Sequence, residues 1–95
     1  MYTRKATVAA SVGLHARPAA VFVRAVNRTG LPITLAKSGV SAIDARSLLA
    51  VMSGDFAFGS EVILSVSHCD AEAASIEAAI DGLAELLATD LSEQA

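Results

Sequence analysis

The chain has 95 residues, of which 54% are hydrophobic, so it is long enough for one domain with a single modest core. Its formal net charge is −3 and its lysines and arginines are scattered, which argues against a nucleic-acid-binding protein because such proteins carry a basic patch or stripe. The single cysteine, Cys69, excludes an internal disulfide bond, so we expect a cytoplasmic protein. No apolar run reaches the roughly 20 residues that span a bilayer, so we expect no membrane insertion.

The first two predicted elements are a strand and a helix. Residues 2–9 alternate loosely between apolar and polar side chains, which predicts a half-buried strand. From about Ala16 to Arg28 the sequence predicts a helix. Its apolar stripe, at i, i+3, i+4 and i+7, holds Ala19, Phe22, Val23 and Val26. Gly30 can adopt the left-handed conformation that ends helices, and Pro32 forbids continuation.

The middle of the chain predicts a hairpin and a short helix. Two strands over residues 33–36 and 40–43 flank a tight turn at residues 37–39. A helix is expected from about Ser47 to Ser53, with Ser47 or Asp44 as its N-cap residue and Gly54 as its stop. One short helix cannot bury all of its large apolar side chains, so some of them should stay exposed.

The last two predicted elements are again a strand and a helix. Residues 61–67 carry the strongest strand alternation. The face predicted to be buried holds Val62, Leu64 and Val66. Asp70 and Glu72 open the last helix at its positive end, where acids stabilise it. The buried stripe of this helix is expected to hold Ala73, Ile76, Ile80, Leu83 and Leu87. Residues after about Thr89 are expected to form a loosely ordered tail.

The predicted order is strand–helix–strand–strand–helix–strand–helix. This order lacks the long pattern of buried parallel strands joined by crossovers, so it indicates an α+β layer fold. Residues 1–95 show no linker or internal repeat and are expected to form a single domain.

One heptapeptide carries the candidate chemistry, Gly13-Leu14-His15-Ala16-Arg17-Pro18-Ala19. Pro18 suits the first turn of a helix, so His15 is placed at a helix N-terminus, where free backbone N–H groups favour an anion and phosphate above all. Arg17 adds a cation that can bind phosphate oxygens bidentately, and neutral imidazole is a competent nucleophile. The alternative from residue types alone is that His15 only caps the helix and Arg17 is a solvated surface side chain.

The full heptapeptide, placed between a strand and an amphipathic helix, resembles the active-centre signature of HPr, the phosphocarrier family of the bacterial phosphoenolpyruvate:sugar phosphotransferase system. The resemblance runs from about residue 2 to about residue 88. It implies an open-faced sandwich, in which three helices cover one face of a four-stranded antiparallel sheet. It also implies that the Nδ1 (pros) atom of His15 accepts a phosphoryl group from enzyme I and passes it to IIA units of sugar permeases. The backbone N–H groups of Ala16 and Arg17 and the Arg17 guanidinium would hold the phosphate oxygens.

The chain shows no glycine-rich nucleotide loop and no carboxylate cluster with metal-site spacing. We therefore expect no cofactor and no metal, and a stoichiometric carrier without turnover of its own. His68 and Cys69 are neighbours on a predicted strand and point to opposite faces, so they are interpreted as structural. Phe56 and Phe58 are interpreted as packing within a loop.

Ser47 is a second candidate site. The segment from Arg46 to Ser53 resembles the family segment whose serine is phosphorylated by a regulatory kinase, so a serine kinase/phosphorylase and a transcriptional regulator are candidate partners. A phosphoserine at a helix N-terminus is electrostatically favourable. The alternative is that Ser47 is a plain N-cap residue, as serine is in proteins of every kind.

A docking patch for partners is expected around His15. Its apolar part is Ala20, Leu48, Leu49 and Met52, and its basic rim is Arg24 and Arg28. The alternative is that the aliphatic side chains belong to the core and the arginines only solubilise. We expect a monomer. A different class of function also stays open, a regulatory module that binds transcription factors or enzymes according to its phosphorylation state, including a nitrogen-related paralogue.

Overall fold

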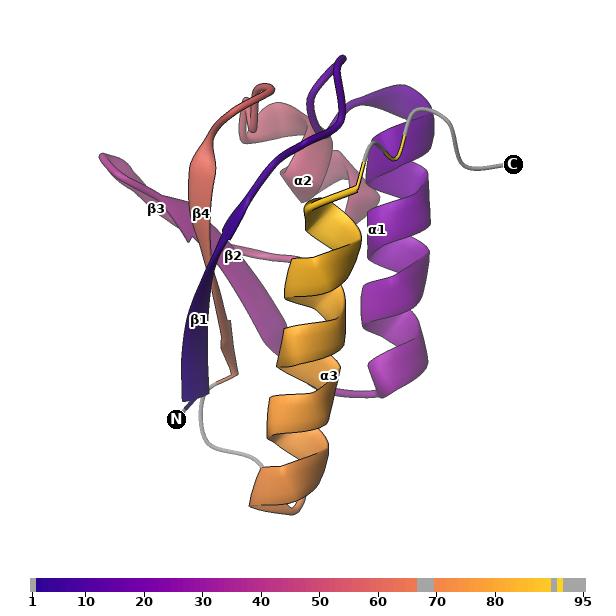
Figure 1. Ribbon diagram of the computed structural model, residues 1–95, viewed down its shortest axis with the longest axis vertical. Helices are drawn as coiled ribbons and strands as arrows, with labels where there is room; N and C mark the ends of the chain where they lie inside the picture. The colour runs from indigo at the N-terminus through magenta and orange to yellow at the C-terminus, as the bar shows by residue number, and fades with distance from the viewer. Residues whose placement is uncertain (1, 67–69, 90, 92–95) are drawn as a thin grey trace.

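The described part of the chain forms four strands and three helices, which follow one another in the predicted order (Figure 1). The computed structural model describes residues 2–66, 70–89 and 91. The elements are β1 (Tyr2–Thr7), α1 (Ala16–Thr29), β2 (Ile33–Lys37), β3 (Val40–Asp44), α2 (Leu48–Ser53), β4 (Glu61–Val66) and α3 (Ala73–Leu87). Within the described residues, no helix is both long and apolar enough to cross a membrane.

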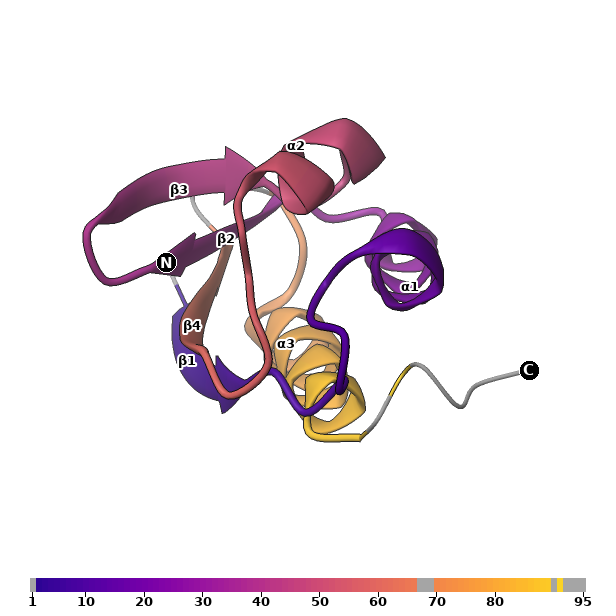
Figure 2. The same cartoon turned by 90° about the horizontal axis from the view of Figure 1, so that it is seen from above.

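The strands form one antiparallel sheet in the order β1-β4-β2-β3. Figure 2 shows the three helices gathered on one side of this sheet. The residues of β4 alternate as predicted: Val62, Leu64 and Val66 are buried, whereas Ile63 points to the opposite face and is 37% exposed. The predicted open-faced sandwich is thereby confirmed.

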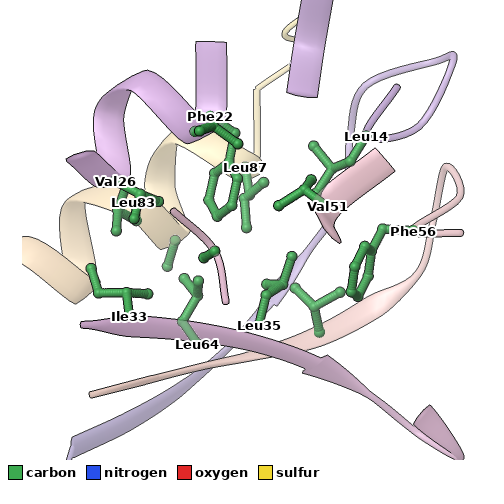
Figure 3. Packing of buried hydrophobic residues seen from close by; sticks show 14 of the residues in the cluster. Leu14, Phe22, Val26, Ile33, Leu35, Val51, Phe56, Leu64, Leu83 and Leu87 are labelled. Atoms are coloured by element: carbon green, nitrogen blue, oxygen red, sulfur yellow. The ribbon is translucent and has the colours of Figure 1, made fainter. Parts of the chain in front are cut away.

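The hydrophobic core lies between the sheet and the helices, where Figure 3 shows aliphatic and aromatic side chains converging from both layers. α1 buries the four residues of its predicted stripe together with Pro18. α2 contributes only Val51 as a buried residue, and its two leucines, Leu48 and Leu49, stay exposed, as predicted. The buried residues of α3 are Ile80, Leu83, Ala84 and Leu87. Ala73 and Ile76 were also expected among them, but Ile76 is only half-buried and Ala73 is exposed, because the first turn of α3 extends past the end of the sheet (Figure 1).

Two details at element ends differ from the prediction. β1 ends at Thr7, because the backbone N–H of Ala9 donates to the carbonyl of Leu87 (3.0 Å) and so draws the chain from the sheet toward the end of α3. Glu72 is the N-cap residue of α3, but its side chain makes no capping hydrogen bond, so its effect is limited to its charge. The predicted strand end at Ser67 and the pair His68–Cys69 lie outside the described residues.

The helix ends follow the predicted chemistry with one difference. Gly30 closes α1 in the left-handed conformation, at φ 71°. Gly54 closes α2 at φ −80°, which any residue can adopt. A side chain at Gly54 would place Cβ 2.3 Å from the ring of Phe56, so glycine is required here for space and not for conformation.

Leu91 is the one described residue beyond Thr89. Its side chain is fully buried and belongs to the core cluster. This burial departs from the loose tail that the sequence led us to expect from about Thr89 onward.

Candidate functional site

His15 sits at the end of a loop that one backbone hydrogen bond ties to the α2–β4 connection and another closes locally. The backbone N–H of Leu14 donates to the carbonyl of Phe56 (2.8 Å), and the N–H of His15 donates to the carbonyl of Gly13 (3.0 Å). The side chain of Leu14 is only 2% exposed and points into the core (Figure 3), whereas His15 is exposed. The fold therefore holds the backbone next to His15, at Leu14, while it leaves the imidazole at the surface.

His15 is the N-cap residue of α1, but its side chain makes no capping hydrogen bond. The imidazole is therefore not used for capping, and the role of His15 stays a prediction. The first turn of α1 contains no acidic residue, so no carboxylate there competes with an incoming anion for the positive end of the helix dipole. Arg17 is exposed in this turn, and Pro18 is buried beneath it.

Gly13 is required by both its conformation and its surroundings. Its φ of 74° lies in the left-handed region. An ideal Cβ on Gly13 would lie 2.8 Å from the carbonyl oxygen of Phe56 and 3.1 Å from Cα of Ala57. The loop that carries His15 thus lies directly against the backbone of the α2–β4 connection, more than 40 residues away along the chain.

Ala16, the first residue of α1, has a φ of 51°, although it is not glycine. For a residue with a Cβ, the left-handed conformation costs roughly 1–2 kcal/mol. Strain of this kind gathers at functional sites, where the surrounding structure imposes it. The strained residue here is the direct neighbour of His15.

An Ala16→Gly variant is expected to keep its stability or to gain up to about 1 kcal/mol. Glycine relieves the backbone strain, and this gain offsets the larger conformational entropy that glycine gives the unfolded chain. The matched control is Ala78→Gly, at an exposed position inside α3, which should lose about 1 kcal/mol. Urea unfolding of the two variants beside the parent chain measures both effects. Equal losses in the two variants would contradict the strain at Ala16.

A groove of about 480 Å³ opens beside His15. One wall is the loop before α1, and the other is the end of α2 with the segment that follows it. The lining residues are Ser11, Val12, Leu14, His15, Met52, Ser53, Asp55, Phe56, Ala57 and Phe58. Of the predicted docking residues, Met52 thus lies at the same groove as His15. The sequence interpretation missed this groove, and it treated Phe56 and Phe58 alike although Phe56 is 2% exposed and Phe58 is 65% exposed.

Ser47 is the N-cap residue of α2, and its Oγ accepts a hydrogen bond from the backbone N–H of Ala50 (3.2 Å). Its structural role is therefore the N-cap, and its phosphorylation stays a prediction. Asp44, the other N-cap candidate, instead accepts hydrogen bonds from the backbone and the guanidinium of Arg46. These bonds hold the pKa of the Asp44 carboxyl below its usual value, and they fix the turn that leads into α2.

The other predicted docking residues lie on α1 and α2, which are neighbours (Figure 2). Leu49 is 77% exposed and Leu48 is 42% exposed, so neither belongs to the core. Ala20 and Met52 are half-buried, and Arg24 is exposed. Asn27 links the two helices, because its Nδ2 donates to the carbonyls of Val23 on α1 and of Arg46 just before α2. Residues 2–66, 70–89 and 91 contain no group of three or more His, Cys, Asp or Glu side chains that could hold a metal ion.

Comparisons with known proteins agree on one family. Residues 2–89 match the family model described as the PTS HPr component phosphorylation site. Phosphocarrier protein HPr of Streptomyces coelicolor is 45% identical over 93 residues, which cover 98% of this chain and 95% of that protein. HPr-like protein Crh of Bacillus subtilis is 39% identical over 64 residues, which cover 67% of this chain and 74% of that protein.

Solved structures share the fold as well. The crystal structure of a phosphocarrier protein HPr from Bacillus anthracis superposes with a TM-score of 0.75 at 32% identity, over 90% of this chain and 94% of that chain. The comparisons support the phosphocarrier and not the regulatory module that the sequence left open. The chain therefore belongs to the HPr family of phosphocarriers, which serve the phosphotransferase system.

Proposed function

We propose that His15 is the residue that carries the phosphoryl group, accepting it from enzyme I and passing it to the IIA units. The observation that carries this proposal is the placement of the imidazole, which is exposed, uses no capping hydrogen bond and stands at the N-terminus of a 14-residue helix. In the forward step, the lone pair of Nδ1 attacks phosphorus and forms the new P–N bond. The bond from phosphorus to the donor breaks, and its electron pair stays on the donor.

The first turn of α1 would stabilise the negative charge that arrives with the phosphoryl group. A helix N-terminus stabilises an adjacent anion by about 0.3–1 kcal/mol at an exposed site. The backbone N–H groups of Ala16 and Arg17 are the donors proposed for the phosphate oxygens. The Arg17 guanidinium would add charge-assisted hydrogen bonds, which are roughly twice as strong as neutral ones.

A carrier of this kind needs its partner to complete the reaction. Phosphoryl transfer depends on alignment and on charge stabilisation, and this chain offers an acceptor atom and one side of the charge clamp. We infer that enzyme I and the IIA units supply the rest and that the chain has no turnover of its own. Ser47 is the proposed site of a regulatory kinase, since it stands at the start of α2 beside Leu48 and Leu49 of the docking patch. The cytoplasmic location and the monomeric state stay predictions.

The experiment is phosphorylation with enzyme I and labelled phosphoenolpyruvate. The parent chain should take up one acid-labile phosphoryl group, and His15→Ala should take up none. The matched control is His68→Ala, at the second histidine of the chain, which should be labelled like the parent. Label that persists in His15→Ala would overturn the assignment.

The contribution of Arg17 is measured separately. Arg17→Ala should slow transfer by about 10- to 100-fold, because a hydrogen bond from a charged group contributes about 1.5–3 kcal/mol. Lys5→Ala removes the same charge at an exposed position of β1 and should leave the rate unchanged. Equal rates in the parent and in Arg17→Ala would remove Arg17 from the mechanism.

A further inference from the structure

Lys37, the last residue of β2, stands on the face of the sheet that the helices cover. Ile33 and Leu35 precede it on the same face, and both are fully buried. Its partner on β4 is Val62, which is also fully buried. The alternation of β2 would suit another apolar side chain here, but the chain has a half-buried lysine. A lysine at the edge of a core lays its aliphatic stem against apolar surface and carries its ammonium outward.

The ammonium of Lys37 is held by the segment that follows α2. Its Nζ donates a hydrogen bond to the backbone carbonyl of Asp55 and lies 5.5 Å from the centroid of the Phe56 ring. The face of an aromatic ring attracts a cation at this distance. The Phe56 ring is itself only 2% exposed and belongs to the core (Figure 3). Lys37 thus contacts two consecutive residues, one through its backbone and the other through its side chain.

The backbone of this segment needs such contacts. Asp55 has a φ of 55°, in the left-handed region, which aspartate tolerates better than most residues but does not prefer. The orientation of the peptide group between Asp55 and Phe56 is therefore set by its surroundings more than by local preference. The hydrogen bond from Lys37 acts directly on this peptide group, because it ends on the Asp55 carbonyl.

The next carbonyl along the chain, that of Phe56, holds the loop of His15. It accepts the hydrogen bond from the backbone N–H of Leu14 (2.8 Å), and its oxygen is the atom nearest to a Cβ added at Gly13. Lys37 and Leu14 thus bind adjacent carbonyls of one short segment. Leu14 directly precedes His15, so a rotation of the segment would reach His15 through a single hydrogen bond.

We propose that Lys37 is a positioning residue for His15. By holding the Asp55 carbonyl and the Phe56 ring, it keeps the Phe56 carbonyl in place for the N–H of Leu14 and thereby fixes the approach of the imidazole. The inference rests on the proposed function of His15. Phosphoryl transfer depends on alignment, and a misplacement of about 1 Å can slow a reaction by about 100-fold. Lys37 does not line the groove beside His15, so its effect reaches the imidazole through the segment.

The first test is the rate of labelling by enzyme I and phosphoenolpyruvate. Lys37→Met removes the ammonium and keeps an apolar stem. It should lower kcat by about 10-fold at unchanged KM, as expected for a modest loss of alignment. Lys37→Arg should restore most of the rate, because a guanidinium also donates hydrogen bonds and lies over aromatic rings. An unchanged kcat in Lys37→Met, a rise in KM alone, or an arginine variant as slow as the methionine variant would overturn the inference.

The matched control is Lys5→Met, on the opposite face of the same sheet. Lys5 pairs with Ile63 of β4, and its Nζ lies 3.9 Å from a carboxylate oxygen of Glu61 at an exposed position. This variant loses the same charge without a contact to the segment after α2, so its kcat should match the parent chain. A loss in Lys5→Met equal to that in Lys37→Met would mean that net charge controls the rate, and it would overturn the inference.

Hydrogen exchange at the backbone amide of Leu14 tests the contact without any phosphoryl transfer. Exchange at Leu14 should be about 10-fold faster in Lys37→Met, because the segment that accepts its hydrogen bond opens more often. It should stay near the parent rate in Lys37→Arg and in Lys5→Met. The amides of β4 should accelerate less than Leu14. Equal acceleration at Leu14 and along β4 would show a general loss of stability and would overturn the inference.

The two measurements together separate this inference from the proposed function. If exchange at Leu14 depends on Lys37 as expected but the parent chain is not labelled, the proposed function fails and the contact from Lys37 to the loop stands. If the parent chain is labelled at His15 while neither kcat nor exchange responds to Lys37→Met, the inference fails and the function stands. Faster exchange at Leu14 with an unchanged kcat would also overturn the inference, because the loop would then be loosened without consequence for transfer.

Discussion

Gly13→Ala is expected to destabilise the protein by about 1–5 kcal/mol. The left-handed φ of Gly13 costs a residue with a Cβ roughly 1–2 kcal/mol, and the clash with the backbone at Phe56 adds the roughly 1–3 kcal/mol of an overpacked site. Alanine also lowers the conformational entropy of the unfolded chain, which restores about 0.4–1 kcal/mol of stability. For a domain of this size, the loss lowers the unfolding temperature by roughly 4–8 °C per kcal/mol.

Gly39→Ala is the matched control, because Gly39 has a φ of 80° but has nothing within 4 Å of an added Cβ. Its loss should be only about 1 kcal/mol. The difference between the two variants isolates the close approach of the His15 loop to the α2–β4 connection. Because the Cβ pushes against the backbone that accepts the bond from Leu14, Gly13→Ala should also slow phosphoryl transfer. Equal losses in the two variants, measured by urea unfolding, would refute the close approach.

Leu91→Ala is expected to lose about 2–5 kcal/mol of unfolding free energy, as buried leucines do when they are truncated. Leu91 is fully buried within the core cluster, although it lies in the last few residues of the chain. The same change at Leu49, which is 77% exposed, should alter stability by less than about 0.5 kcal/mol. The two variants thus compare the loss of unfolding free energy when the same side chain is truncated at a buried and at an exposed position.

Thermal and urea unfolding of the two leucine variants measure this difference. A Leu91→Ala variant as stable as Leu49→Ala would mean that the end of the chain contributes nothing to the core. The expected loss would instead show that this leucine is part of the folded domain, so that a chain ending at Thr89 should be destabilised as well.

Much of the fold was predictable because its signals are local. The stripe of α1 and the alternation of β4 each reflect one element packed against a single layer, so a period of 3.6 or 2 residues describes them. The same holds for Ser47, whose capping bond reaches only three residues along the chain. The prediction failed at Ala73, because periodicity does not tell where the sheet beneath a helix ends.

The sequence predicted which residues stand at the helix start, but it did not predict the backbone conformation and burial of the residues around them. The heptapeptide places His15, Arg17 and Pro18 at a helix start, since a proline in the first turn is a signal within the same seven residues. The left-handed conformation of Ala16 has no signal of its own, because alanine normally favours the helix interior. The different fates of Phe56 and Phe58 also had no signal, since the two residues belong to one short loop.

The sequence by itself determined the order of the elements, the helix N-terminus at His15 and the membership in a phosphocarrier family, because each depends on residues close together in the chain. Only the tertiary structure decided the groove beside His15, the need for glycine at position 13 and the burial of Leu91. Each of these depends on contacts between segments that are far apart in sequence. The hydrogen bond from Leu14 to Phe56 is the clearest case, because neither residue alone indicates that their backbones meet.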